Sequence, residues 1–304
     1  MKRFAIFILM LLGLAGVAFA QQEAVPSQAD LRFQDANQWL NQSNLSITTS
    51  PEQAFMSDYV LVKAEGLPKQ GVAHPGQKRL TAIAAAKALA YRELAAFLDG
   101  VAVASDKLVK DSALEYDVVR TAVAGFIKGA QVVYEEYNPQ EETAIVFIKV
   151  GMTGPKSFAK VMYEKMLGDP SVRQAIVEPN PAYRTKPVTL EERYDGLIID
   201  ATEQSFRPAL INRIFTPKGE VLYDPSKISQ KVLVEQGCGE YTNSVDKAKA
   251  ALETRGVRNP LIVKASGTVS PSDLQVADDD AVKIFSANQK ANFLAGAKVA
   301  FVLK

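Results

Sequence analysis

The sequence has very few of the residue types that most often carry out chemistry. Its 304 residues include a single histidine, His74, and a single cysteine, Cys238. Zinc sites and iron–sulfur clusters need several such ligands, so both are excluded. A lone cysteine also excludes an intrachain disulfide, and we interpret Cys238 as a small buried hydrophobe, with a reactive thiol as the alternative.

Motifs for phosphate binding and for nucleophilic catalysis are also absent. The sequence contains no Walker A pattern, no G-x-G-x-x-G and no G-x-S-x-G nucleophile turn. A Ser-His-Asp triad would have to use His74, whose position in the loop VAHPG favours a solvated side chain. We therefore predict a protein without enzymatic activity, cofactor or metal.

The chain also lacks a strong charge of one sign. It has 35 Lys and Arg against 34 Asp and Glu, a formal net charge of +1. Nucleic-acid-binding domains usually have a marked basic bias, so we predict no nucleic-acid partner.

Residues 1–20 have the pattern of an export signal. Lys2 and Arg3 precede an apolar run that ends in a small-x-small pattern, which predicts cleavage between Ala20 and Gln21. The run is shorter than the roughly 20 residues that a membrane helix needs. A lipoprotein would carry Cys at position 21. The expectation is a periplasmic protein with neither a lipid anchor nor an integral membrane segment after cleavage.

Residues 21–55 form a polar segment that is expected to act largely as a tether. Phe33, Ala36 and Leu40 share one face of a short predicted helix. Trp39, the only tryptophan, has two interpretations: an exposed anchor for a partner, or a side chain docked on the first domain.

Residues 56–167 are predicted to form a first domain of order β-α-β-α-β-β with a further helix, an α+β arrangement of helices on a sheet. Strands are expected over 58–66, 101–110, 130–137 and 142–150, and helices over 77–98, 112–128 and 155–167. The alanine-rich helix 77–98 indicates a close approach to a neighbour. Ser112 and Glu115 have the spacing of a capping box.

The strand ETAIVFIKV, Glu142–Val150, is apolar on both faces. One face can meet the helices of its own domain, but the other needs a second cover. That cover could be the helix 155–167 or the second domain, or it could be another protein. In the last case the interaction surface would include four side chains: Tyr134, Tyr137, Ile145 and Phe147.

Residues 168–193 are rich in proline and are predicted to be a linker. Residues 194–304 then form a mixed α/β second domain. Its strands are expected over 195–201, 210–215, 220–223, 259–267 and 297–304, and its helices over 228–235, 244–255 and 278–287. Pro217 and Gly219 suit the turn of the hairpin, and the last strand is expected inside the sheet.

Carboxylates are the remaining candidates for chemistry. Asp200 follows an apolar strand, as a catalytic carboxylate often does, although a capping role or a pair with Arg207 or Arg213 explains it as well. The run of three aspartates at 278–280 is better explained by a helix N-terminus than by calcium, since the spacing of an EF-hand is missing. Glu135 and Glu136 are adjacent on a strand and cannot converge on one site.

Residues 59–150 resemble a known family. The motifs AYRELAAFLDGV, IKGAQVV and VFIKV look like the Lpp-twenty type domain of bacterial envelope lipoproteins, which also occurs in the flagellar assembly protein FlgT and the flagellar lipoprotein FlgP. YDGLIIDA, PALINRIF and NPLIVKASG look like the C-terminal half of longer envelope proteins with this domain. The chain departs from the lipoprotein members because it lacks the acylated cysteine.

Two hypotheses for function follow. The resemblance implies an exported, non-enzymatic scaffold or assembly protein of the cell envelope. Its partners would be envelope proteins, flagellar basal-body components among them, or further copies of itself. The alternative is a periplasmic hydrolase or small-ligand-binding protein with a site near Asp200, between the domains.

Overall fold

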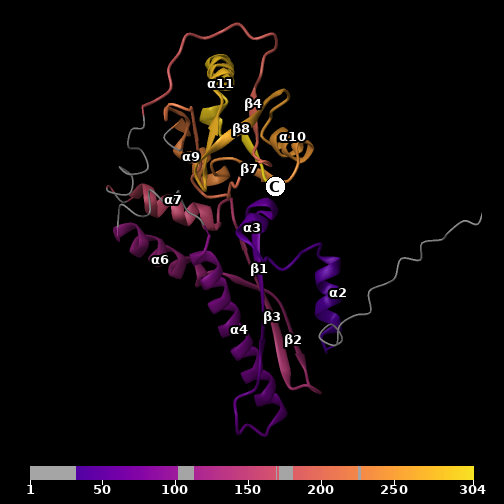
Figure 1. Ribbon diagram of the computed structural model, residues 1–304. Helices are drawn as coiled ribbons and strands as arrows, with labels where there is room; N and C mark the ends of the chain where they lie inside the picture. The colour runs from indigo at the N-terminus through magenta and orange to yellow at the C-terminus, as the bar shows by residue number, and fades with distance from the viewer. Residues whose placement is uncertain (1–31, 102–112, 169, 171–180, 225–226) are drawn as a thin grey trace, which may run out of the picture.

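The computed structural model describes residues 32–101, 113–168, 170, 181–224 and 227–304. The predicted export signal, the predicted strand 101–110 beyond its first residue and the cap Ser112 lie outside these ranges. Within them the chain forms two α+β units, as expected, and the first extends away from the second (Figure 1).

The first domain is built on a three-stranded antiparallel sheet of order β1-β3-β2. The strands are β1 (Tyr59–Gly66), β2 (Gln131–Asn138) and β3 (Thr143–Gly151). Helix α4 (Pro75–Asp99) lies along β1 and β3, while α6 (Ala113–Ile127) packs on α4 and α7 (Phe158–Gly168). One long helix, rather than two, therefore covers the inner face of the sheet.

Alanine in α4 allows the helix backbone to approach the sheet closely. Ala82, Ala86 and Ala90 are buried on its inner side. At Gly66, where β1 ends, an added Cβ would lie 2.2 Å from the backbone nitrogen of Ala86 and 2.4 Å from the carbonyl oxygen of Ala82. Only glycine fits there, so the predicted close approach is confirmed.

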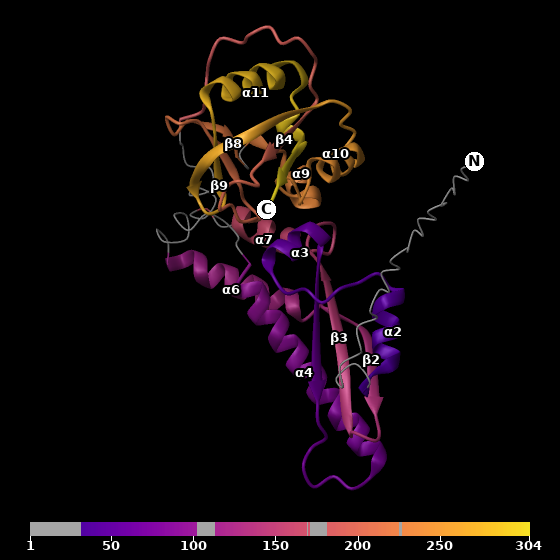
Figure 2. The same cartoon turned by 45° about the vertical axis from the view of Figure 1, so that its right-hand side comes forward.

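Strand β3 is buried on both faces, as its sequence predicts. Ala144, Val146 and Ile148 belong to the large core beneath α4. Ile145 and Phe147 belong to a separate cluster on the other face. That face is covered by helix α2 (Gln34–Gln42), which lies across the sheet from α4 (Figure 2).

The second domain has a seven-stranded sheet of order β6-β5-β9-β8-β4-β10-β7. Strands β8, β4, β10 and β7 are parallel neighbours, and β10 lies inside the sheet, as predicted. The strands are β4 (Gly196–Asp200), β5 (Arg213–Phe215), β6 (Val221–Tyr223), β7 (Glu240–Thr242), β8 (Pro260–Ser270), β9 (Asp273–Val276) and β10 (Val299–Val302).

The three predicted helices of this domain are present as α9 (Gln230–Gln236), α10 (Val245–Thr254) and α11 (Asp278–Ala291), followed by the 3-10 helix η2 (Leu294–Gly296). The predicted hairpin is β5–β6, and its turn closes with the amide of Gly219 donating to the carbonyl of Thr216 at 3.0 Å. Strands β7 and β9 were not predicted, because three or four residues carry too little periodicity by themselves. The equally short β5 and β6 were predicted with the help of the turn between them.

The proline-rich segment is not a free linker over its described part. The backbone nitrogen of Tyr183 donates to the carbonyl of Val221 at 2.9 Å, and that of Val188 donates to the hydroxyl of Ser286 at 2.9 Å. Residues 181–193 therefore run along the second domain, because their backbone finds partners there.

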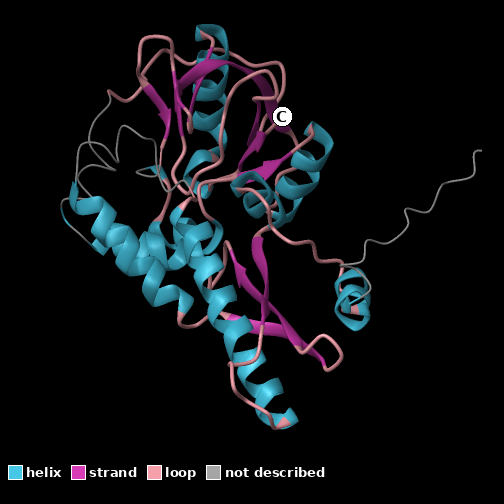
Figure 3. Ribbon diagram, turned by 60° about the horizontal axis from the view of Figure 1, so that its bottom comes forward, coloured by secondary structure: helices cyan, strands magenta, loops and turns pink. Residues whose placement is uncertain are grey.

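The two domains meet in a buried, partly polar contact. Tyr163 of α7 donates its hydroxyl hydrogen to the carbonyl of Leu210 in the second domain. Phe55 of α3 (Pro51–Ser57) packs on Tyr241 of β7 with ring centroids 5.1 Å apart. Figure 3 shows α4 running from this region to the far end of the molecule.

Replacing Gly66 by alanine is expected to destabilise the first domain by about 3 kcal/mol, because the new Cβ would collide with backbone rather than with a movable side chain. Unfolding in urea, followed by the fluorescence of Trp39, measures the change. Gly125→Ala is the control, since its Cβ would meet nothing within 4 Å on α6. Equal midpoints for Gly66→Ala and the parent protein would contradict the close approach.

Candidate functional site

Asp200, the predicted candidate carboxylate, is engaged by its own neighbour. Its Oδ1 accepts hydrogen bonds from the backbone nitrogen of Thr202 at 3.1 Å and from the Thr202 hydroxyl at 2.7 Å. The hydroxyl bond lowers the pKa of Asp200 below its usual value, against the opposing effect of burial. Asp200 therefore caps the turn after β4, and Arg213 pairs with Asp273 instead, with 2.6 Å between guanidinium and carboxylate.

The other candidate residues also have structural roles. His74 is the N-cap of α4, and its Nδ1 accepts a hydrogen bond from the backbone nitrogen of Gly76 at 3.2 Å. The three aspartates at 278–280 form the first turn of α11, where negative charge meets the positive end of the helix dipole. Among the described residues, no group of His, Cys, Asp and Glu is arranged to hold a metal ion.

Cys238 is a buried residue of the domain contact. It is 3% exposed, and its Sγ lies 3.5 Å from the hydroxyl of Tyr163. Burial raises the pKa of the thiol to about 11, and the hydrogen bond between Cys238 and Tyr163 opposes that rise only in part. A thiol in this state is a poor nucleophile, which supports the interpretation of Cys238 as a packing residue.

Glu135 and Glu136 point to opposite sides of the sheet, as the strand pattern predicts. Glu135 pairs with Lys87 of α4, with 2.7 Å between the charged atoms. Glu136 accepts a hydrogen bond from the backbone nitrogen of Ala36 at 2.8 Å. Since Phe33, the N-cap of α2, makes no side-chain cap, Glu136 supplies one from the neighbouring strand.

The predicted interaction residues are mostly covered by the chain itself. Ile145 and Phe147 are 2% and 1% exposed beneath α2. Tyr134 lies on the same face, and burial together with the nearby charge of Glu136 raises its pKa to about 12. Tyr137 packs against the core on the α4 side. The second face of the sheet is therefore an internal surface while α2 is docked.

Trp39 fixes α2 in place. Its ring stacks on Tyr134 at a centroid distance of 4.9 Å and also contacts Phe147 at 5.3 Å. Of its two interpretations, the described structure supports docking on the first domain. The described part of the segment expected to be a tether, residues 32–55, is thus a structural part of that domain.

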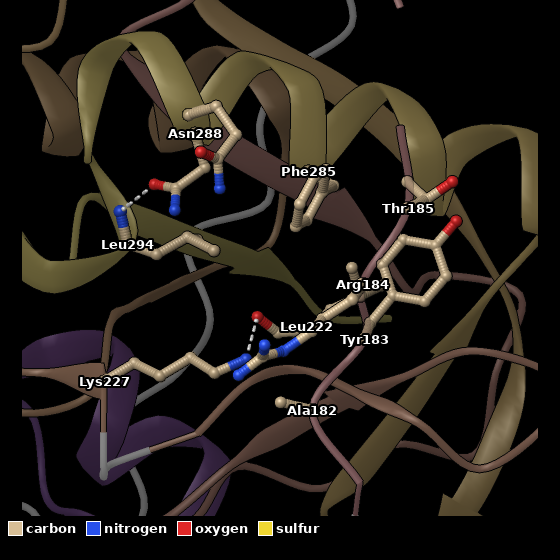
Figure 4. Close-up of a pocket in the computed structure, with 10 residues that line it drawn as sticks. Ala182, Tyr183, Arg184, Thr185, Leu222, Lys227, Phe285, Asn288 and Leu294 are labelled. Carbon is tan, nitrogen blue, oxygen red and sulfur yellow. Dashed lines mark hydrogen bonds between the residues drawn. The ribbon is translucent and has the colours of Figure 1, made fainter. Parts of the chain in front are cut away.

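A cavity of about 530 Å³ opens on the second domain (Figure 4). It lies between the segment 182–185, helix α11 and the end of β6. Its walls combine cationic, amide, hydroxyl, aromatic and aliphatic side chains. The lining residues are Ala182, Tyr183, Arg184, Thr185, Leu222, Lys227, Phe285, Asn288, Gln289 and Leu294.

Lys227 is held firmly at the edge of this cavity. Its Nζ donates to the carbonyls of Val221 at 2.9 Å and Leu222 at 3.0 Å. Burial lowers the pKa of Lys227, while the charge of Asp224 partly opposes that change. This site was not predicted, because its residues come from distant segments of the chain and form no local motif.

A second hollow of about 520 Å³ lies beyond the carboxyl ends of β4 and β10. It is lined by the turn that follows Asp200, together with Pro271 and Lys304. Asp200 is not among its lining residues. All residues that line this hollow belong to the second domain.

Comparisons with known proteins concern the second domain. Residues 196–304 match a protein family described as the second domain of Treponema pallidum Tp0624. The match spans about a third of the chain. No curated protein matches the sequence. The resemblance of residues 59–150 to the Lpp-twenty type domain stays a prediction. Within the described residues, every helix is too short or too polar to cross a bilayer.

Replacing Trp39 by alanine is expected to destabilise the protein by about 2 kcal/mol and to expose the outer face of the sheet, since the stacked ring closes that face. Thermal unfolding by circular dichroism and binding of the dye ANS measure the two effects. Gln38→Ala, an exposed change on the same helix, is the control and should alter neither. Unchanged dye binding in Trp39→Ala would show that α2 is not the cover.

Cys238 should react with a thiol reagent at pH 8 about a hundredfold more slowly in the folded protein than after denaturation, because burial and the raised pKa suppress the thiolate. The rate of colour development with DTNB, with and without guanidinium, measures the ratio. Comparable rates would mean that the contact between the domains opens readily.

Proposed function

We propose that this protein is an exported, non-enzymatic scaffold or assembly protein of the bacterial cell envelope, which acts through protein–protein contacts. The expected export signal supports this proposal, as does the resemblance of the first domain to the Lpp-twenty type. A flagellar association would follow from the same resemblance. The contact region that we propose is the far end of the first domain.

That region, here called the distal tip, consists of residues 67–81 and 138–142. Its parts are held together by two contacts. The backbone nitrogen of Lys69 donates to the hydroxyl of Thr81 at 3.2 Å, and Lys78 forms an ion pair with Glu142. The register of β1 with β3 places Gly66 opposite Ala144, which brings the two segments to the same end of the sheet.

The observation that carries the proposal is the exposure of two leucines at the distal tip. Leu67 and Leu80 are 67% and 69% exposed, more than any other large apolar side chain among the described residues. Single exposed leucines are common on protein surfaces, but two at one projecting end provide apolar area that a partner can bury.

The architecture supports the same reading. The tip lies at the end of the long helix α4, whose 25 residues span about 37 Å. The domain contact at Tyr163 and Phe55 anchors the other end of this arm. An anchored arm that presents apolar side chains at its end is suited to bridging two components. The alternative site at Asp200 has no comparable support, since that carboxylate caps its own turn.

Cross-linking in cells tests the proposal. A photoreactive amino acid at position 80 is expected to capture one defined envelope protein, or a second copy of this chain, whereas the same group at Val269 should not. Val269 is a fair control because it is also apolar and exposed, at 55%, but belongs to the second domain. The captured protein would then be purified and titrated onto the isolated chain.

The double variant Leu67→Glu/Leu80→Glu should weaken that binding at least tenfold, because two charges would have to be buried in the contact. Its unfolding midpoint should stay near that of the parent, since both side chains are exposed. Undiminished binding by a folded double variant, or equal capture from positions 80 and 269, would refute the role of the distal tip.

A further inference from the structure

We propose that the cavity lined by Arg184, Lys227 and Phe285 binds a small molecule in which an oxyanion, a carboxylate or phosphate, is joined to an apolar, ring-bearing body. This site lies on the second domain, apart from the distal tip, and goes beyond the scaffold function.

The charge of the cavity wall is the first argument. The ten lining residues include two cations, Arg184 and Lys227, and no carboxylate. Asp224 lies close enough to influence Lys227 but is not part of the lining, and it has interactions of its own. Two cations at one concave surface favour an anion that can contact both.

Lys227 and Arg184 would contribute to anion binding in different ways. Lys227 is fixed by the carbonyls of Val221 and Leu222, and an ammonium has three donors, so one remains for a ligand. No described residue forms an ion pair with the exposed guanidinium of Arg184, which offers the planar fork that binds carboxylates and phosphates at two points. Both side chains lie along the lower edge of the opening in Figure 4.

The opposite wall is suited to an apolar body. Phe285 meets Tyr183 edge to face, with ring centroids 5.8 Å apart and planes at 89°, so both rings are held in place. Leu294 adds an aliphatic side chain to the lining, and Leu222 lies beside Lys227, whose Nζ donates to its carbonyl. Asn288 faces the opening from α11 (Figure 4), and its oxygen is occupied by the backbone nitrogen of Leu294 at 3.0 Å. Its amide hydrogens are the donors left for a ligand.

The size of the cavity argues against a bare anion. A volume of about 530 Å³ falls within the range of roughly 300 to 1,000 Å³ that is typical of sites for small organic molecules. Inorganic phosphate would occupy the cationic edge and leave the aromatic wall uncovered. An anion with a ring attached would use both.

Isothermal titration of the full-length mature chain with phenyl phosphate tests the proposal, with benzoate, inorganic phosphate and phenol as comparison ligands. Phenyl phosphate or benzoate should bind with one-to-one stoichiometry, and at least tenfold more tightly than inorganic phosphate or phenol. Arg184→Met should weaken the tighter of the two about tenfold, since it removes a charge-assisted hydrogen bond.

Lys186→Met is the matched control. Lys186 is exposed in the same segment and does not line the cavity, so its loss should change affinity less than twofold. Phe285→Leu keeps a hydrophobic side chain but removes the ring, and it should weaken the aromatic ligands without affecting inorganic phosphate.

Three results would overturn the proposal. The first is no binding of phenyl phosphate or benzoate at about 10 mM, where even weak affinity is measurable. The second is equal weakening by Arg184→Met and Lys186→Met, which would indicate diffuse attraction. The third is equal affinity for phenol and phenyl phosphate. None of these results depends on the distal tip, so the two proposals can fail independently.

Discussion

Strand β3 of the first domain is apolar on both faces, and the domain is arranged so that both faces are buried. Because β3 is apolar on both sides, the chain has to supply two covers. On one side, the alanines of α4 and the missing side chain of Gly66 let helix and strand approach to backbone contact. On the other, α2 brings an aromatic stack. Helix α2 has no side-chain cap of its own. The carboxylate of Glu136 on β2 accepts a hydrogen bond from the backbone nitrogen of Ala36 in the first turn, so the sheet stabilises the helix that covers it.

The same requirement explains why residues 32–55, which were expected to belong to a tether, pack on the first domain. Once α2 is docked, the chain must return to β1, and it does so through Thr48, which exchanges hydrogen bonds with Leu61 on the edge of that strand. Helix α3 then carries Phe55 to Tyr241 in the second domain. The segment thus connects the outer cover, the sheet edge and the domain contact. Its stability and that of the first domain are linked.

The features that could be predicted from the sequence are those that depend on residues close together in the chain. Alternation in Glu142–Val150 assigned the two faces of the strand correctly, and the three helices predicted in the second domain lie close to their observed positions. What covers the second face could not be predicted, because docking of α2 on β2 joins residues about 100 positions apart. Helix α3 was not predicted, because the segment 21–55 is polar overall. The sequence does contain a signature for its start, in the residues Ser50, Pro51 and Gln53. The cavity at Lys227 has no local pattern at all.

The energetics of the distal tip limit the kind of contact it can make. Burying one leucine side chain contributes about 1.5 to 3 kcal/mol, so Leu67 and Leu80 together contribute roughly 3 to 6 kcal/mol. Association costs an estimated 4 to 15 kcal/mol or more in lost freedom. In the proposed contact, two leucines alone would not hold a stable complex, so the surrounding polar surface, including the pair Lys78–Glu142, would have to take part. Alternatively, several copies of the protein, each binding weakly through its distal tip, would bind together with high avidity if they were held at a fixed spacing, as in a ring or array. The buried contact at Tyr163 would keep the first domain of each copy in a defined direction.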